Sequence, residues 1–325
     1  MLALGASLLV LVSACTAGGG GPTEGSPRSE PPPAGSASPN QSALSVTIGS
    51  AAFYEAQLMG EIYAQALEAS GFEVERQLGI GPRDNTQAAI TSGQVDLVPE
   101  YIGSLLAFLG REAGEEGSDR FQPTGDSDET FSRLEVALEE IGLSALDYTP
   151  AQDHNAFVVR PDTAEHYGLE TMTDLASVAT ELVWGLPPEC DGNPLCRGAL
   201  EDVYGIPWDE LQIEPLAPCD APMAIALNED AIDVAELCST QPDIERFGFV
   251  VLEDDQLTQP AENIAPVIRT GVLETLPADV VDVLNEVSAQ MTTEELTSLG
   301  VRVAVDQEPI PDVARSWLEE HGLVD

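Results

Sequence analysis

From about residue 44 onward, short apolar runs typical of strands alternate with amphipathic helical segments, and this pattern restricts the possible folds most strongly. Residues 44–49 read as a buried strand, and residues 55–70 read as a helix whose apolar side chains share one side and which ends before Gly71. The same order continues through residues 72–75, 86–92 and 95–98, and we expect Pro99 to end the third strand. This order predicts an α/β fold with a mainly parallel sheet.

Two loops of this first part are candidate binding segments. In open α/β sheets, ligands bind beyond the carboxyl ends of the strands, near loops and helix starts. Residues 49–54 follow the first expected strand, and residues 99–104 follow the third. We therefore expect side chains from both loops to face one ligand site.

The middle of the chain repeats the alternation and reads as a second lobe. A helix is expected at 130–142, followed by strands near 156–159, 182–185, 232–235 and 249–252. Residues 264–268 read as a strand that crosses back, and the tail reads as helices.

The N-terminus has the features of an export signal. Residues 2–12 form an apolar run that is too short to span a membrane, and Val12-Ser13-Ala14-Cys15 follows, which resembles a bacterial lipobox. We expect residues 1–15 to be a lipoprotein signal peptide and Cys15 to be lipidated. An ordinary signal peptide with an incidental cysteine is the alternative. No basic residue precedes the apolar run, which is compatible with a start codon further upstream.

Residues 16–43 are rich in Gly, Pro and Ser, a composition that cannot bury a core and that indicates a disordered tether. The formal net charge of the chain is -45, and all 12 basic residues are arginine. A field this negative repels nucleic acid and anionic membrane surfaces, so no nucleic-acid partner is expected. The charge is either a solvated coat or a contribution to the attraction of cationic ligands.

The chain has five cysteines, and four remain for disulfides if Cys15 is lipidated. Three connectivities are then available, and we favour Cys190–Cys196 together with Cys219–Cys238. A zinc site is the alternative, but the chain has no Cys-x-x-Cys spacing and only three histidines. We therefore expect no metal and no cofactor.

Several segments, taken in order, resemble the substrate-binding proteins of quaternary-amine ABC importers, which bind glycine betaine, choline, carnitine or related osmoprotectants. The most specific segment is Asp96-Leu97-Val98-Pro99-Glu100-Tyr101-Ile102-Gly103; the others are residues 49–55, 60–68, Arg83, 153–159, 174–175 and 265–269. The resemblance implies a two-lobed, type II periplasmic-binding-protein fold with a hinge of two crossover strands. Lobe one would comprise residues 44–150 plus 260–325, and lobe two residues 151–259.

The resemblance also implies a set of ligand-binding residues. Tyr101 would offer its ring face to a quaternary ammonium group, and Ser104 follows it in the same loop. The other implied ligand residues belong to lobe two: Asp153, Asn155 and Glu189.

The sequence departs from the family pattern at several positions, and a serine–threonine–aspartate run near the pocket reads Ser239-Thr240-Gln241 here. Met223 and Cys238 stand where further cage tyrosines are usual, and Ala51 and Asn193 replace basic residues that bind a carboxylate in some members. Arg197 is close enough in sequence to substitute for the basic residue that Asn193 replaces.

These features predict an extracytoplasmic solute-binding lipoprotein of an ABC importer. It would bind a small osmoprotectant-like ligand between the lobes and deliver it to the permease subunits, as a monomer anchored by lipid to the outer face of the cell membrane. A lipid-anchored sensing or scaffold domain is the alternative. An exported enzyme is a weaker one, since no Gly-x-Ser-x-Gly motif is present and the three histidines are scattered.

Overall fold

The computed structural model describes residues 45–115, 117–217 and 221–324, without the side chain of Glu189. The predicted signal peptide, the lipidation site Cys15, the tether and Cys219 lie outside the described residues. In the part of the chain that is described, no helix combines the length and the apolar character that a membrane crossing needs.

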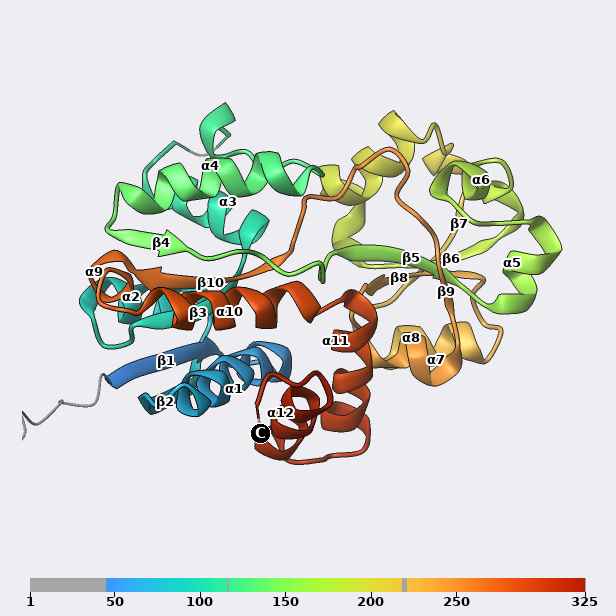
Figure 1. The fold of residues 1–325 in the computed structure, drawn as a ribbon. Coiled ribbons are helices and arrows are strands. Elements are labelled where there is room, and N and C mark those ends of the chain that lie inside the picture. The colour runs from blue at the N-terminus through green and yellow to red at the C-terminus, as the bar shows by residue number, and fades with distance from the viewer. Residues whose placement is uncertain (1–44, 116, 218–220, 325) are drawn as a thin grey trace, which may run out of the picture. The chain divides into compact units, whose positions relative to one another are not determined.

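The first sheet has five strands in the order β2-β1-β3-β10-β4 (Figure 1). β1 is parallel to β2 and β3, whereas β10, which arrives late in the chain, is antiparallel to β3 and β4. The strands are β1 Ser45–Ala51, β2 Glu73–Gly81, β3 Leu97–Tyr101, β4 Leu143–Ala145 and β10 Ile264–Arg269.

Helices cover both faces of this sheet, because successive strand residues point to opposite sides and both sides are apolar. Leu97 and Ile264 belong to one buried cluster, and their neighbours Val98 and Ala265 belong to the other. The helices of the first cluster are α1 Tyr54–Ala69, α10 Ala278–Gln290 and α12 Ile310–Glu320, and those of the second are α2 Arg83–Ser92, α3 Ile102–Glu112 and α4 Ser127–Glu139.

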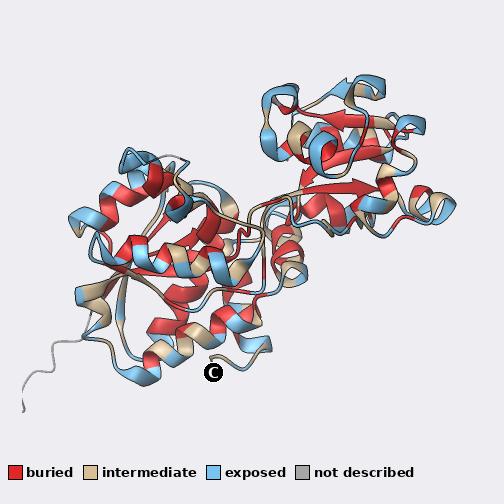
Figure 2. Ribbon diagram, turned by 90° about the horizontal axis from the view of Figure 1, so that it is seen from above, coloured by how far each residue is buried: buried red, intermediate tan, exposed pale blue. Residues whose placement is uncertain are grey.

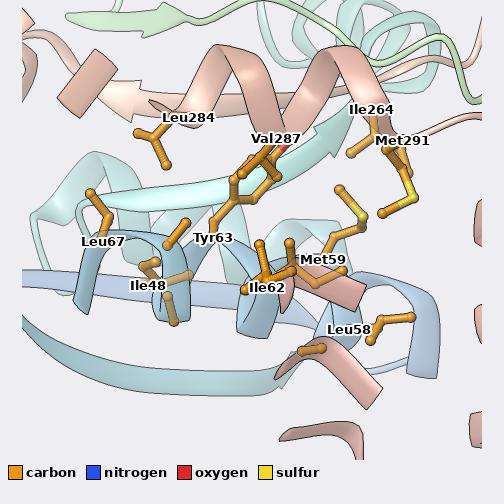
Figure 3. Packing of buried hydrophobic residues seen from close by; sticks show 14 of the residues in the cluster. Ile48, Leu58, Met59, Ile62, Tyr63, Leu67, Ile264, Leu284, Val287 and Met291 are labelled. Atoms are coloured by element: carbon orange, nitrogen blue, oxygen red, sulfur yellow. The ribbon is translucent and has the colours of Figure 1, made fainter. Parts of the chain in front are cut away.

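Side chains of α1 and α10 interlock in the first cluster (Figure 3). Tyr63 of α1 lies beside Val287 of α10, and its hydroxyl shares a 2.9 Å hydrogen bond with Ser288 Oγ. This buried hydroxyl therefore has a partner inside an otherwise apolar layer. Shorter elements complete this part of the chain: η1 Asp119–Phe121, α9 Thr270–Leu273, α11 Thr293–Gly300 and η6 Val301–Val305.

The second sheet repeats the plan with the order β7-β6-β8-β5-β9. β6 is parallel to β7 and β8, and β5 is antiparallel to β8 and β9. Both faces of this sheet are again buried (Figure 2). Its strands are β5 Asn155–Val159, β6 Val183–Leu186, β7 Gln212–Pro215, β8 Val234–Cys238 and β9 Val250–Val251. Its helices are α5 Pro161–Tyr167, α6 Met172–Ala176, η2 Ala179–Glu181, η3 Pro188–Gly192, η4 Pro194–Val203, η5 Trp208–Glu210, α7 Ala221–Asn228 and α8 Pro242–Phe247.

Two chain segments join the sheets, and they are hydrogen-bonded to each other. Gln152 and Asn263 form an antiparallel bridge, and the backbone N–H of Asp153 donates to the carbonyl oxygen of Glu262 at 3.1 Å. The Asn263 side chain donates to the Thr149 carbonyl oxygen at 2.8 Å. We call residues 149–153 and 259–263 the crossing segments.

The predicted α/β class is confirmed, with two corrections to its details. The sheets are mixed rather than mainly parallel, because β10 and β5 run against their neighbours. Pro99 does not end the third strand, which continues to Tyr101. Pro99 lies opposite Pro266 of β10, and facing residues of an antiparallel pair need not exchange hydrogen bonds, so the missing N–H leaves the ladder intact.

Candidate ligand-binding site

A pocket of about 400 Å³ lies where elements of both sheets meet, and we call it the Asp153 pocket. Phe53, Tyr54 and Glu55 enter it from the start of α1, directly after β1. Asp153 enters it from a crossing segment. The remaining lining residues belong to the end of β8, the turn after it and the start of α8: Cys238, Thr240, Gln241 and Pro242. Both strand ends therefore contribute, as expected for an α/β fold.

A neighbouring hollow of about 430 Å³ shares Phe53 with this pocket, and we call it the Arg83 pocket. Tyr101 and Arg83 line it, together with Glu100. The rings of Phe53 and Tyr101 are 5.9 Å apart between centroids, and Phe53 is 47% exposed. Phe53 is therefore an exposed aromatic residue shared by two hollows, and an aromatic ring face can attract a cation.

The predicted site residue Tyr101 is the last residue of β3 and is buried. Its hydroxyl donates a hydrogen bond to Glu55 Oε1, and the residue lines the Arg83 pocket. Tyr101 and the predicted residue Asp153 are thus connected through Glu55, which lines the same pocket as Asp153.

Glu55 and Asp153 place two carboxyl groups in one pocket. Burial, followed by the negative charge of Asp153, raises the pKa of Glu55 to about 8, although hydrogen bonds with Tyr101 and Thr240 act to lower it. Burial also raises the pKa of Asp153, opposed by hydrogen bonds from Thr240 and by the electrostatic effect of the nearby His154. Asp153 Oδ1 is buried and has no hydrogen-bond partner among the described residues.

The predicted residue Ser104 donates hydrogen bonds to a third carboxyl group, that of Glu262. Its hydroxyl donates to Glu262 Oε1 at 2.6 Å, and its backbone N–H donates to Glu262 Oε2 at 3.0 Å. Burial raises the pKa of Glu262 to about 7, opposed by these bonds and by Arg83. Gly103 permits this contact, since a Cβ there would lie 2.5 Å from the Ala261 carbonyl oxygen. Ser104 therefore holds a crossing segment against α3 and does not line the Asp153 pocket.

The other two predicted residues are not among the described residues that line this pocket. Asn155 is the first residue of β5 and lies opposite Cys238 in the sheet. Glu189 belongs to η3, and its side chain is outside the description. The pocket also contains residues that the sequence analysis did not select, chiefly Glu55. Its spacing from the buried Leu58 and Ile62 places it on the buried side of α1, which is the signal that could have identified it.

One of the two predicted disulfides is described in full. Cys190 and Cys196 form a disulfide, which confirms that pairing. Cys238 is also disulfide-bonded, and Cys219, the partner that we predicted for it, lies outside the described residues. The disulfide of Cys190 closes the turn between η3 and η4, on the second sheet's side of the molecule.

Positive charge is scarce around the pocket. Arg197, the sequence candidate for binding a carboxylate, is paired with Asp191 at 2.5 Å and with Glu201 at 2.9 Å. Arg83 is paired with Glu100 at 3.0 Å. Among the described arginines, every one except Arg111 has a carboxylate oxygen within ion-pair distance. The described lining of the Asp153 pocket contains no basic residue.

The chain matches one protein family over most of its length and is similar to two glycine-betaine-binding proteins. Residues 45–320 match the family model described as the substrate-binding domain of ABC-type glycine betaine transport systems. A glycine-betaine-binding protein of Pseudomonas aeruginosa is 27% identical over 293 residues, covering 87% of this chain and 90% of that one. The glycine betaine-binding protein YehZ of Escherichia coli is 28% identical over 290 residues, covering 87% and 93%.

Solved structures agree on the fold. The crystal structure of a glycine betaine/carnitine/choline ABC transporter protein superposes with a TM-score of 0.77 at 20% identity, covering 86% of this chain and 100% of that one. At this identity the likeness shows the fold, which is the two-lobed type II periplasmic-binding-protein fold.

Proposed function

We propose that this chain, which belongs to the family of substrate-binding domains of ABC-type glycine betaine transport systems, binds a small quaternary-ammonium solute in the Asp153 pocket. The chain is a solute-binding component of a transporter and not an enzyme. The observation that carries the proposal is the composition of the pocket, in which two carboxyl groups and the exposed ring of Phe53 face one cavity. A quaternary ammonium group cannot donate ordinary N–H hydrogen bonds, so negative charge and aromatic faces are what recognise it.

The size of the pocket supports a small solute. A cavity of about 400 Å³ lies within the range of small-molecule sites. Relatives named for glycine betaine cover nearly the same length of chain, which favours a ligand that carries a trimethylammonium group. The bound form would be presented to the permease subunits of the transporter.

Calorimetry with choline, glycine betaine and carnitine tests this proposal, with a neutral polyol as the comparison ligand. At least one of the three solutes should bind, and Phe53→Ala should weaken that binding about tenfold, a loss of about 1.4 kcal/mol. Ile225→Ala is the matched control, because Ile225 is an exposed apolar residue of α7 that does not line the pocket. Unchanged affinity in Phe53→Ala, or binding of the polyol alone, would contradict the proposal.

We also propose that the mature protein is a monomer anchored to the outer face of the cell membrane through lipid on Cys15. The support is the lipobox-like Val12-Ser13-Ala14-Cys15 and the Gly, Pro and Ser-rich residues after it. Cys15→Ala should release the protein into the soluble fraction. Retention of that variant in the membrane fraction would rule the anchor out, and size-exclusion chromatography with light scattering checks the monomer.

A further inference from the structure

We propose that the Asp153 pocket selects a ligand of net positive charge that lacks a carboxylate, and that it releases one proton to solvent when this ligand binds. The inference rests on the proposed function, because it concerns the ligand of the same pocket. It goes further by naming the charge class of the solute and by adding a proton to the binding equilibrium.

The first observation is the kind of polar atom that the pocket leaves without a partner. Among the described residues, Asp153 Oδ1 and Gln241 Oε1 are buried without a hydrogen-bond partner, and both residues line this pocket. The orientation of the Gln241 amide is fixed by its nitrogen, which donates to Asp243 Oδ2 at 2.9 Å. Both unpartnered atoms are therefore acceptors, and they fit a ligand that brings positive charge or hydrogen-bond donors.

The second observation is the absence of a basic side chain in the described lining. The chain has no lysine, and the nearest described arginine that faces either hollow, Arg83, is already paired with Glu100. A zwitterion such as glycine betaine would bring its own carboxylate towards Glu55 and Asp153 with no free guanidinium to receive it. A ligand without a carboxylate, such as choline, avoids this repulsion.

The proton follows from the proximity of two buried carboxyl groups. Two carboxyl groups that share a water-poor site cannot both be ionised without a compensating cation, so they retain a proton between them. When a cation enters the pocket, its positive charge makes the ionised form of both carboxyl groups favourable. The O–H bond of the protonated carboxyl group then breaks. The proton passes to water or buffer, and the electron pair stays on the carboxylate. The raised pKa of Glu55 agrees with this scheme.

The other charged and titratable groups near Glu55 and Asp153 are already engaged or neutral, so they do not take over the role of these two carboxyl groups. Arg83 is paired with Glu100, and Arg246 lies 3.4 Å from Asp243. Burial raises the pKa of both Tyr54 and Tyr101, so they remain neutral. His154 binds the Asn155 carbonyl oxygen through Nδ1, and both oxygens of Glu262 are bound by Ser104. Glu55 and Asp153 are therefore the carboxyl pair that meets the ligand.

Calorimetry of choline binding to the full chain in two buffers of different ionisation enthalpy, phosphate and Tris, counts the protons at pH 7.0. We expect about one proton released per choline, and a choline affinity that falls by close to tenfold per pH unit from 7.5 to 5.5. Tetramethylammonium should release the same number. Glycine betaine should bind at least tenfold more weakly than choline at pH 7.5, because it carries the extra carboxylate.

Glu55→Gln and Glu139→Gln provide the matched pair of variants. Glu55→Gln removes the second carboxyl group of the pocket, so choline affinity should change less than about twofold per pH unit and proton release should disappear. Glu139→Gln removes the same charge from an exposed position of α4 and should keep the wild-type slope and proton count. The wild-type proton count needs no variant, so the test survives if Glu55→Gln fails to fold.

The outcomes separate the two proposals. Choline binding without proton release, or tighter binding of glycine betaine than of choline, overturns this inference and leaves the solute-binding function in place. Failure of choline, tetramethylammonium, glycine betaine and carnitine alike contradicts the proposed function, and this inference falls with it.

Discussion

The hydroxyl of Tyr101, at the end of β3, donates its hydrogen bond to Glu55 at the start of α1. Tyr101 thus lines the Arg83 pocket and donates a hydrogen bond to a carboxyl group of the Asp153 pocket. Substitutions of Tyr101 can therefore distinguish the contribution of its ring to ligand affinity from the contribution of its hydroxyl.

We expect Tyr101→Ala to weaken choline binding at least tenfold, about 1.4 kcal/mol, because Phe53 loses the ring that packs beside it. Tyr101→Phe keeps the ring and should change the affinity less than about threefold, or about 0.7 kcal/mol. Calorimetry of both variants measures this difference. Equal losses in the two variants would mean that the hydroxyl, and not the ring, is the part that matters for the ligand.

Asp153→Asn should lower choline affinity at least tenfold, because it removes a partly desolvated negative charge from the pocket. Asp209→Asn is the control, since Asp209 is an exposed residue of η5 outside the pocket. Both variants neutralise one carboxylate, so a general effect of the chain's acidity would appear in each. An equal loss in both would remove the specific role of Asp153.

The stability of the ligand-free protein should depend on pH through Glu55. Its pKa in the folded state is about 8, above its ordinary value, so the folded protein binds more protons than the unfolded chain between about pH 4.5 and 8. The free energy of unfolding should therefore fall as the pH rises through this window. Each pKa unit corresponds to about 1.4 kcal/mol. In Glu55→Gln this decrease should be smaller, which urea unfolding at pH 5 and pH 8 would reveal; an identical decrease in both proteins would contradict the assignment.

Gly103→Ala should destabilise the protein by about 1–3 kcal/mol, because the added Cβ would lie 2.5 Å from the Ala261 carbonyl oxygen and push a crossing segment away from α3. Gly271→Ala in α9 is the control, since no atom lies within 4 Å of a Cβ built there. Thermal unfolding of the two variants checks the difference. Equal stabilities of the two variants would show that the crossing segment moves away from the added Cβ without a loss in the free energy of unfolding.

Removing the Cys190–Cys196 disulfide by the double substitution Cys190→Ser and Cys196→Ser should cost less than about 2 kcal/mol of stability. The loop that the disulfide closes is short, so the disulfide reduces the conformational entropy of the unfolded chain only by a small amount. Peptide mapping without reductant should link Cys190 to Cys196 and Cys219 to Cys238. Free thiols at these positions would contradict the predicted framework.

Local patterns were sufficient for many of the strands and helices, because apolar periodicity reflects which face of an element is buried, but they read residues 99–104 as a loop where β3 ends and α3 begins. They were insufficient for Pro99, whose place within β3 depends on Pro266, a partner contributed from far along the chain. The site shows the same limit. Tyr101 and Asp153 were selected from the family resemblance, whereas Glu55 enters the pocket only because α1 and a crossing segment converge on it. Ser104 was assigned to the ligand, but its hydroxyl is bound to Glu262, a contact that no local pattern encodes.

The bridge between Gln152 and Asn263 turns the two connections between the sheets into a short ribbon. A single strand can swivel about any of its backbone bonds, but two strands that are hydrogen-bonded side by side resist bending within their common plane and bend easily out of it. Any relative motion of the sheets must therefore bend both connections together. Asp153 lies on this ribbon and lines the pocket, so the residue that brings a carboxyl group to the ligand also belongs to the connection between the two sheets.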